Sequence, residues 1–424
     1  MGHTHHLLDE LARRHPRTRF TVTITGGEQL EQLGRLQTPD GPTVDLFRVA
    51  THFPQLICGS GSTRKDAELV HHFYDERVDD QHNPVWVSLA HQYTSCVTAA
   101  ETHDLVLQNI NSLVAVLKAV ETGLLNSELR LTGVIHDATG ASGRFRYIAR
   151  HVVENQGPRI SLIAVSESIR SALCESGIPA ERVRKITNGM DVDKFHERIR
   201  HSRATNTFSD VRRRNNVPPD TRIILMSARR VPWKGHEDLI QAAALLMSYD
   251  GFDDGRIVIN GAGLLDSRSM DYEFELRQLI TDLQLTDKVF LLDRLTREEV
   301  AACYAAAYIA VLPSRDPEPF GYANIEAMLA GAPVIATAHG GPLEYIEDGV
   351  SGVLVPPRNP SAIASAIHWL LHDAAAHNRI GTAGRASAGR FTVDAMIDAY
   401  DAVICGHADG SIKGGNHDDV HSRH

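Results

Sequence analysis

The chain has 424 residues and a formal net charge of −10, with 42% hydrophobic and 23% charged residues. This composition is typical of a globular protein, and the length predicts two domains because it exceeds a single ordinary core. The negative charge argues against nucleic acid as a partner, since binding to phosphate backbones is driven by Lys and Arg.

In chain order, strand-like apolar runs alternate with amphipathic helix-like stretches, which predicts parallel sheets covered by helices on both faces. A helix-like stretch over residues 7–15 stands where a strand and turn would normally open such an array. The N-terminal domain is therefore expected to lack its first strand, either because its sheet begins with a helix or, as we favour, because the natural chain starts upstream. The strands expected in this first array are residues 19–25, 44–49, 105–109, 131–136, 162–165 and 184–187.

A polar stretch rich in Arg and Asn follows at residues 191–220. It predicts a linker over 196–220, between an N-terminal domain of residues 1–195 and a C-terminal domain of residues 221–388. The strands expected in the second array are residues 222–226, 256–260, 288–292, 309–312, 334–337 and 352–355. Helices are expected at 112–125, at 272–285 and after Thr296, which forms a capping-box pattern with Glu299. A helix over 392–403, within the segment 389–406, is expected to cross back to the first domain, and residues 407–424 to form a disordered tail.

The segment 317–326 carries the strongest chemical signal and follows an expected buried strand. Pro319 and Gly321 predict a tight turn directly before a helix, so that free backbone N–H groups would lie at the carboxyl edge of the sheet, where a phosphate is stabilised. Glu318 lies on this turn and Glu326 about a turn and a half into the helix. We therefore expect the two carboxylates to serve different parts of a ligand. The alternative is one solvent-exposed carboxylate and one on the helix surface.

A basic loop with Arg229 and Lys234 follows the strand expected at 222–226. A leaving nucleoside diphosphate gains negative charge as the glycosidic bond breaks, and a positioned Arg and Lys stabilise that charge. The alternative is a solvated loop between a strand and a helix.

Taken together, the ordered motifs resemble the retaining glycosyltransferases of family 4, which have the GT-B fold. The resemblance covers nearly the whole chain. It implies an α/β protein with two Rossmann-like domains that face each other across a cleft, the donor in the C-terminal domain and the acceptor mainly in the N-terminal one. The motifs are Arg-x4-Lys-Gly at 229–235, Asn-Gly-Ala-Gly at 260–263, Glu-Pro-Phe-Gly-x4-Glu-Ala-Met at 318–328 and Gly-Gly-Pro-x-Glu at 340–344, with weaker matches at 134–137, 166–168 and 188–191.

The resemblance also implies roles for individual residues. The donor would be bound by Arg229, Lys234, Gly261, Glu318, Phe320, Gly321 and Glu326. Arg229 and Lys234 would hold the diphosphate and Glu326 the ribose hydroxyls. Glu318 would hold the transferred sugar, next to the backbone of Phe320 and Gly321.

Across the cleft, His136 would approach the reacting sugar and, with Asp137, the acceptor. The catalytic set is then His136, Arg229, Lys234 and Glu318. In the mechanism proposed for such enzymes the leaving phosphate takes the acceptor proton, so a dedicated protein base need not exist. The alternative for His136 is a structural histidine at the end of a buried strand.

Other chemistries are disfavoured by the sequence. The pair Asp191-x-Asp193 has metal-binding spacing, but its first member belongs to the motif at 188–191, so we expect no metal. We also expect no cofactor, because the nucleotide sugar is a substrate. The five cysteines are scattered, which favours reduced thiols. The chain has no apolar run of the roughly 18 residues that a membrane span needs, and a short basic helix at its start is not expected to bind membranes. We expect a cytoplasmic protein.

The predicted function is therefore the retaining transfer of a sugar from a nucleotide sugar, a UDP-sugar on family grounds, to a hydroxyl acceptor. A small polyol or aminocyclitol and a glycan are the candidate acceptors. A sugar phosphorylase or nucleotide-sugar epimerase of the same fold stays open as an alternative. A non-catalytic protein that binds nucleotide sugars is the alternative from another class.

Overall fold

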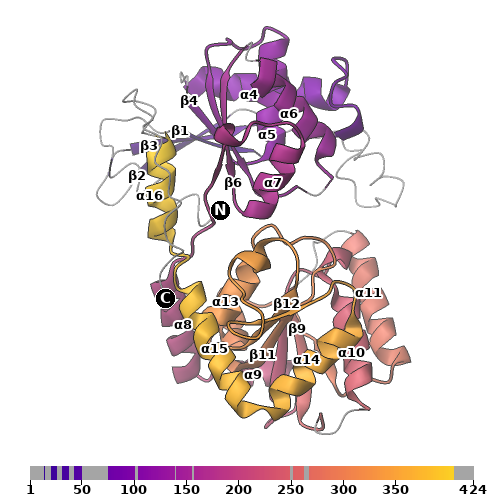
Figure 1. Cartoon of the computed structure of the whole chain (residues 1–424). Helices are drawn as coiled ribbons and strands as arrows, with labels where there is room; N and C mark the ends of the chain where they lie inside the picture. The colour runs from indigo at the N-terminus through magenta and orange to yellow at the C-terminus, as the bar shows by residue number, and fades with distance from the viewer. Residues whose placement is uncertain are drawn as a thin grey trace, which may run out of the picture.

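The computed structural model describes two α/β domains, one above the other in Figure 1. The described residues are Arg14 and residues 21–25, 31–37, 43–49, 75–100, 104–138, 140–154, 157–248, 252–261 and 267–404. The expected helix at 7–15 lies outside this description, except that Arg14 is helical. The predictions of a missing first strand and of a disordered tail at 407–424 also fall outside the described residues.

The N-terminal domain is built around a parallel sheet with the strand order β4-β5-β6-β7. Its central strands are apolar and buried, as expected for a sheet with helices on both faces. The strands are β4 (Asp104–Leu107), β5 (Arg130–Ile135), β6 (Arg159–Ala164) and β7 (Val183–Lys185). The helices are α4 (Pro84–Ala100), α5 (Ile110–Glu121), α6 (Ser142–Glu154) and α7 (Glu167–Glu175).

A separate sheet of three strands precedes this one in the chain, with the order β1-β3-β2. β1 (Thr21–Thr25) pairs with β3 (Thr43–Val49) in parallel, whereas β2 (Glu31–Gln37) pairs with β3 antiparallel. The strands β1 and β3 agree with the sequence expectation. β2 was not expected, because its sequence EQLGRLQ has few β-branched residues and a central glycine.

The C-terminal domain has a six-stranded parallel sheet with the order β10-β9-β8-β11-β12-β13. Its strands are β8 (Arg222–Ser227), β9 (Gly255–Asn260), β10 (Val289–Leu291), β11 (Ala307–Leu312), β12 (Val334–Thr337) and β13 (Val353–Val355). Its helices are α10 (His236–Leu246), α11 (Ser267–Asp282), α12 (Arg297–Ala306), α13 (Tyr322–Ala330), α14 (Pro360–His372) and α15 (Ala374–Ala388). Thr296 and Glu299 form the expected capping box at the start of α12. The fold class is confirmed: two α/β domains, each with a parallel sheet.

The segment 196–220, expected to be a linker, instead forms two helices on the C-terminal domain. α8 (Val192–Ala204) and α9 (Thr207–Arg214) bury Phe195, Ile199 and Val211 in the core of that domain. The sequence is polar overall, and a helix with few, well-spaced apolar residues still buries a narrow stripe. Polar composition therefore concealed two packed helices.

The helix α16 (Val393–Ile404) returns to the N-terminal domain and is the yellow helix beside it in Figure 1. Its buried residues Val393, Met396, Ile397, Tyr400 and Val403 belong to the core of that domain. Where the chain passes between domains, the backbone N–H of Met190 donates to Phe391 O at 2.9 Å and that of Val393 to Met190 O at 3.0 Å. A Cβ at Gly189 would lie 2.4 Å from Thr392 O, so only glycine permits this approach.

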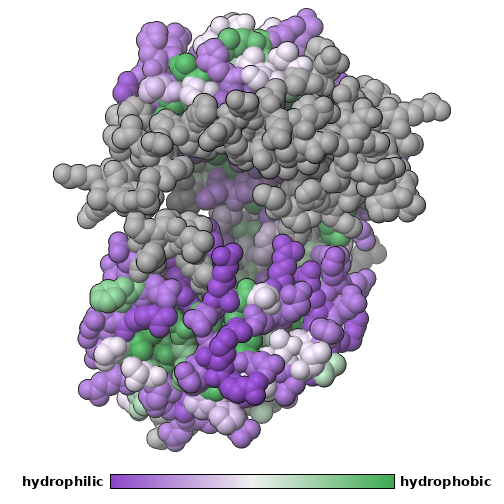
Figure 2. All heavy atoms as spheres, turned by 180° about the vertical axis from the view of Figure 1, so that it is seen from behind, coloured by the Kyte–Doolittle hydropathy of each residue, from purple (hydrophilic) through white to green (hydrophobic). Residues whose placement is uncertain are grey.

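The carboxyl edges of the two sheets face each other. Glu344 ends the short 3₁₀ segment η4 (Gly341–Glu344), which follows β12. Its carboxylate accepts hydrogen bonds from the backbone N–H of Glu167 at 2.6 Å and from Lys185 Nζ at 3.0 Å. Glu167 begins α7 after β6, and Lys185 ends β7. Seen from behind, hydrophilic side chains cover most of the described surface of the C-terminal domain (Figure 2).

A buried carboxylate fixes the start of α6. Asp75 is 2% exposed and accepts hydrogen bonds from the backbone N–H groups of Gly143 at 2.7 Å and Arg144 at 2.9 Å. The Arg144 guanidinium also donates to it, at 3.2 Å. Burial by itself raises the pKa of Asp75, but the hydrogen bonds from Arg144 and Gly143 outweigh it and hold that pKa below its usual value.

We expect Asp75→Asn to destabilise the protein by about 2 kcal/mol at pH 7, because hydrogen bonds to an ionised acceptor are lost in a buried place. A lowered pKa means that the stabilisation is present above the ordinary carboxyl pKa of about 4 and is lost as pH falls through the lowered value. The difference in the free energy of unfolding between wild type and Asp75→Asn, measured by urea unfolding, should therefore decrease from pH 7 to pH 3. Asp79→Asn is the matched control, since Asp79 forms an exposed pair with Arg150. A gap that does not change with pH would contradict the assignment.

Candidate active site

The predicted site residues lie after strands that end at the facing edges of the two sheets. In the C-terminal domain, Arg229 and Lys234 follow β8, Gly261 follows β9, and Glu318, Phe320 and Gly321 follow β11, with Glu326 on α13. His136 and Asp137 directly follow β5 in the N-terminal domain. In open α/β sheets ligands bind outside the carboxyl ends of the strands, where these residues are placed.

Lys234 and Glu318 form an ion pair at the centre of this edge. Lys234 Nζ lies 2.5 Å from Glu318 Oε2, and both side chains are 14% exposed. Ser314 Oγ donates to the same oxygen at 3.0 Å, and the Lys234 ammonium lies 4.0 Å from the centroid of the Trp233 ring. The motifs at 229–235 and 318–328, far apart in the sequence, therefore meet through their charged residues.

Arg315 holds the two loops that carry this pair. Its guanidinium donates to both carboxylate oxygens of Asp238 at 2.8 Å and also pairs with Glu237. Its backbone N–H donates to Trp233 O at 2.7 Å. The hydrogen bonds that Arg315 donates to Asp238 raise the pKa of Arg315, so the guanidinium stays charged. Sequence reasoning missed Arg315 and Asp238, because no local pattern shows that the start of α10 faces the loop after β11.

The turn before α13 has the geometry expected from its sequence. Gly321 has φ 88° and is the N-cap residue of α13. A Cβ there would lie 2.6 Å from Tyr345 Oη, so a side chain would be both strained and obstructed. Phe320 is buried against Phe391, with ring centroids 5.6 Å apart, and its carbonyl accepts a hydrogen bond from Tyr345 Oη at 2.8 Å. The first N–H groups of α13 thus lie at a rigid turn beside Glu318, where a phosphate would be stabilised.

Glu326 lies on α13 and is partly buried. Tyr304, on α12, donates its hydroxyl hydrogen to Glu326 Oε2 at 2.8 Å. Burial raises the pKa of Glu326, while the hydrogen bond from Tyr304 and the charge of Arg198 act in the opposite direction. The sequence suggested a carboxylate separate from Glu318. It gave no sign of the tyrosine that orients it.

Two adjacent arginines after β8 have different environments. Arg230 is 3% exposed, pairs with Glu273 at 2.7 Å and also donates to Leu292 O. Arg229 is exposed, and its side chain has no hydrogen-bond or ion-pair partner within the described part of the chain. Arg230 is therefore occupied in holding the fold, and Arg229 is the arginine that a ligand could reach.

In the N-terminal domain, His136 and Asp137 are exposed at the end of β5. β5 is adjacent to β6 in the sheet, and β6 leads into the α7 segment that contacts Glu344. His136 and Asp137 therefore lie on the edge of the sheet that faces the C-terminal domain. The Asp191 carboxylate caps α8 by accepting from the backbone N–H of Lys194 at 3.0 Å, which gives it a structural role.

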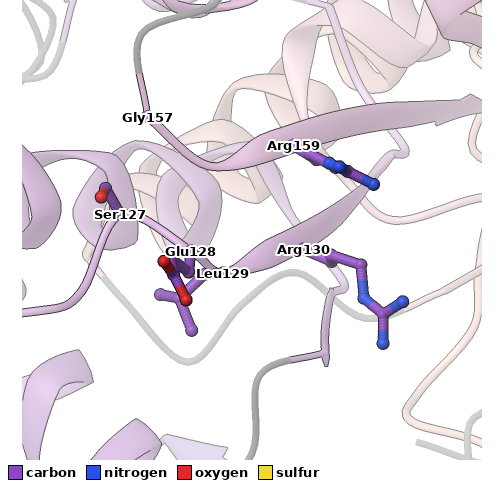
Figure 3. A pocket seen from close by; sticks show the side chains of 6 residues that line it. All are labelled: Ser127, Glu128, Leu129, Arg130, Gly157 and Arg159. Atoms are coloured by element: carbon purple, nitrogen blue, oxygen red, sulfur yellow. The ribbon is translucent and has the colours of Figure 1, made fainter.

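A cavity of about 540 Å³ lies elsewhere, at the amino edge of the N-terminal sheet, where β5 and β6 begin. Figure 3 shows Arg130 and Arg159 projecting from these neighbouring strands, and Arg130 pairs with Asp104 at 2.5 Å. The cavity is on the opposite edge from His136 and is not part of the candidate site. Its lining residues are Ser127, Glu128, Leu129, Arg130, Gly157 and Arg159.

Comparisons with known proteins agree with this geometry. Residues 207–387 match the model of a family described as glycosyl transferases group 1. The D-inositol 3-phosphate glycosyltransferase of Geodermatophilus obscurus is 31% identical over 263 residues, which are 61% of this chain and 56% of that protein. The chain thus matches a little over half the length of this curated relative.

Solved structures show the same two-domain fold. HepE of Anabaena, in complex with UDP and glucose, has a TM-score of 0.66 at 22% identity, covering 94% of this chain and 95% of that one. Sucrose-phosphate synthase from Thermosynechococcus elongatus has a TM-score of 0.68 at 20% identity, covering 95% and 92%.

Two α/β domains with facing carboxyl edges, and charged residues gathered on the C-terminal edge, define the GT-B class of structure. Residues 207–387, which make up most of the C-terminal domain, match the family described as glycosyl transferases group 1. The resemblance to family 4 glycosyltransferases is confirmed. Among the described residues, no helix is both long enough and apolar enough to cross a membrane.

Proposed function

We propose that the chain transfers a sugar, with retention, from a nucleoside diphosphate sugar to a hydroxyl group of an acceptor. The observation that carries this proposal is the Lys234–Glu318 ion pair beside the Gly321 turn. A cation and a helix start suit a diphosphate, and an adjacent carboxylate suits sugar hydroxyls. A site that bound only an anion would not need a carboxylate at the position of Glu318.

The donor is a UDP-sugar in this proposal. Lys234 and Arg229 hold the diphosphate, Glu318 and the backbone of Phe320 and Gly321 hold the sugar, and Glu326 accepts hydrogen bonds from the ribose. Gly261 has φ 103°, and a Cβ there would lie 2.1 Å from Ala228 O, so the loops after β8 and β9 lie against each other beside the donor. HepE of Anabaena, which has this fold, was solved with UDP and glucose.

In the reaction, the bond between the sugar C1 and the phosphate oxygen breaks, and the negative charge on the leaving diphosphate is stabilised by Lys234 and Arg229. The acceptor oxygen bonds to C1 on the same face, and its proton passes to the leaving phosphate oxygen. No protein base is required, and no cofactor takes part. His136 and Asp137 contact the acceptor and the reacting sugar from the N-terminal domain.

The acceptor is a small polyol, an aminocyclitol or a glycan. The relative from Geodermatophilus obscurus is named for D-inositol 3-phosphate, a cyclic polyol derivative, which favours the first of these. We propose that the acceptor binds at the carboxyl edge of the N-terminal sheet, because His136 and Asp137 are exposed there, directly after β5.

The test is to incubate the protein with UDP-, GDP- and ADP-sugars, with and without candidate acceptors, and to measure release of nucleoside diphosphate. Release that depends on both a donor and an acceptor is expected, with a product whose anomeric configuration matches the donor by NMR. Turnover that requires inorganic phosphate in place of an acceptor would indicate a phosphorylase. Conversion of the sugar on the donor, without transfer to an acceptor, would indicate an epimerase. Binding of donors without any turnover would indicate a non-catalytic protein.

A further inference from the structure

Glu326 is held by a buried network that the sequence motifs do not include. Tyr304 is 2% exposed on α12, and its hydroxyl donates to Glu326 Oε2 at 2.8 Å. Ser227, which ends β8, interacts with the Tyr304 hydroxyl and acts to lower the pKa of Tyr304. The Tyr304 ring is fixed edge-on against Phe195 of α8, with ring centroids 6.0 Å apart. Residues of β8 and α8 thus surround the tyrosine of α12 that binds one oxygen of this carboxylate.

We propose that Tyr304 is a positioning residue for recognition of the nucleotide ribose. By holding Glu326 Oε2, it directs the other carboxylate oxygen toward the ribose 2′- and 3′-hydroxyls, and so makes the protein discriminate ribonucleotides from 2′-deoxyribonucleotides. The inference rests on the proposed donor role of Glu326. It adds a residue that does not itself touch the donor.

The chemistry of the pair suits such a role. A glutamate side chain has three rotatable bonds, and an unrestrained carboxylate would lose that freedom when it binds a ligand. Because Tyr304 is buried, its pKa is raised well above its usual value, so its hydroxyl keeps its proton and remains a donor. A carboxylate oriented in advance therefore binds the ribose with less entropy lost.

Three groups face the Glu326 carboxylate from the elements packed around it. They are Tyr304 of α12, Arg198 of α8 and Tyr322 of α13 itself. Burial raises the pKa of Glu326, and Tyr304 and Arg198 oppose that rise. Loss of the Tyr304 hydroxyl therefore moves the pKa further up, and the acid limb of nucleotide binding should shift to higher pH.

The experiment compares UDP with 2′-deoxyuridine 5′-diphosphate by calorimetry, in wild type and in Tyr304→Phe. Wild type is expected to bind UDP about 10-fold or more tightly than the deoxy form, since hydrogen bonds to charged groups have effects of this size. Tyr304→Phe keeps the ring but lacks the hydroxyl, and its preference for UDP over the deoxy form should be much smaller. The acid limb of its UDP binding should lie at higher pH than that of wild type. Ser227→Ala should change the affinity ratio of the two nucleotides and the acid limb of UDP binding in the same direction as Tyr304→Phe, but by a smaller amount.

Tyr147→Phe is the matched control. Tyr147 is 1% exposed in the N-terminal domain and donates to Glu121 Oε2 at 2.8 Å, so its substitution removes the same kind of bond away from the donor. It should leave the nucleotide ratio unchanged. If wild type does not discriminate the two nucleotides, the ribose role of Glu326 fails. If wild type discriminates and both Tyr304→Phe and Ser227→Ala discriminate equally well, the positioning role fails while the donor site stands.

Discussion

Replacing Glu318 with glutamine is expected to lower kcat/KM for sugar transfer by about 100-fold while the protein still folds. Glutamine keeps the shape of the side chain but removes the charge that strengthens its hydrogen bonds to sugar hydroxyls, each worth about 1.5–3 kcal/mol. The side chain is 14% exposed, so the loss of charge is not compensated by water. Initial rates over a range of donor concentrations measure this effect.

The same variant should bind UDP at least as well as wild type, because UDP lacks the sugar and Lys234 is released from its pair with Glu318. The matched control is Glu298→Gln, an exposed glutamate at the start of α12, which should transfer sugar at the wild-type rate. Transfer by Glu318→Gln at the wild-type rate would refute the assignment of Glu318 to the sugar.

Lys234→Ala, unlike Glu318→Gln, is expected to impair both UDP binding and sugar transfer. It should weaken UDP binding by about 10- to 100-fold, because a charge-assisted contact to phosphate is lost. It should also lower kcat/KM by about 100- to 1,000-fold, since the negative charge on the leaving diphosphate grows in the transition state. Calorimetry with UDP and initial-rate measurements together test both statements.

Lys194→Ala is the control for Lys234→Ala, since it removes the same charge from an exposed position at the start of α8. It should change neither UDP binding nor transfer. The structure pairs Lys234 with Glu318, so the donor phosphate must take Lys234 over from the carboxylate when it binds. A UDP affinity that falls equally in Lys234→Ala and Glu318→Gln would show that the two residues do not divide the donor as proposed.

Much of the fold followed from sequence periodicity. Twelve of the thirteen strands in the described residues coincide with predicted apolar runs, since buried parallel strands are short, apolar and bounded by turn residues. β2 was missed because its residues are those of a polar helix or loop, and only pairing with β3 makes it a strand. α8 and α9 were missed because their polar composition conceals a narrow buried stripe.

The arrangement of the candidate site was predictable where its residues lie within one local motif. Glu318, Gly321 and Glu326 share a turn and the helix that follows it, so sequence spacing determines their geometry. The choice between Arg229 and Arg230 depends on Glu273, which lies in another helix. Arg315, Tyr304 and Ser227 act through contacts between elements distant in sequence, and no spacing rule contains them.

The course of α16 also sets an order for folding during synthesis. The core of the first domain includes Val393, Ile397 and Tyr400, which the ribosome makes after both domains have otherwise been translated. The second domain is contiguous from α8 to α15, so it can complete its own core earlier. The domain that is translated first is therefore completed last, and a nascent chain exposes apolar surface on it until α16 leaves the ribosome.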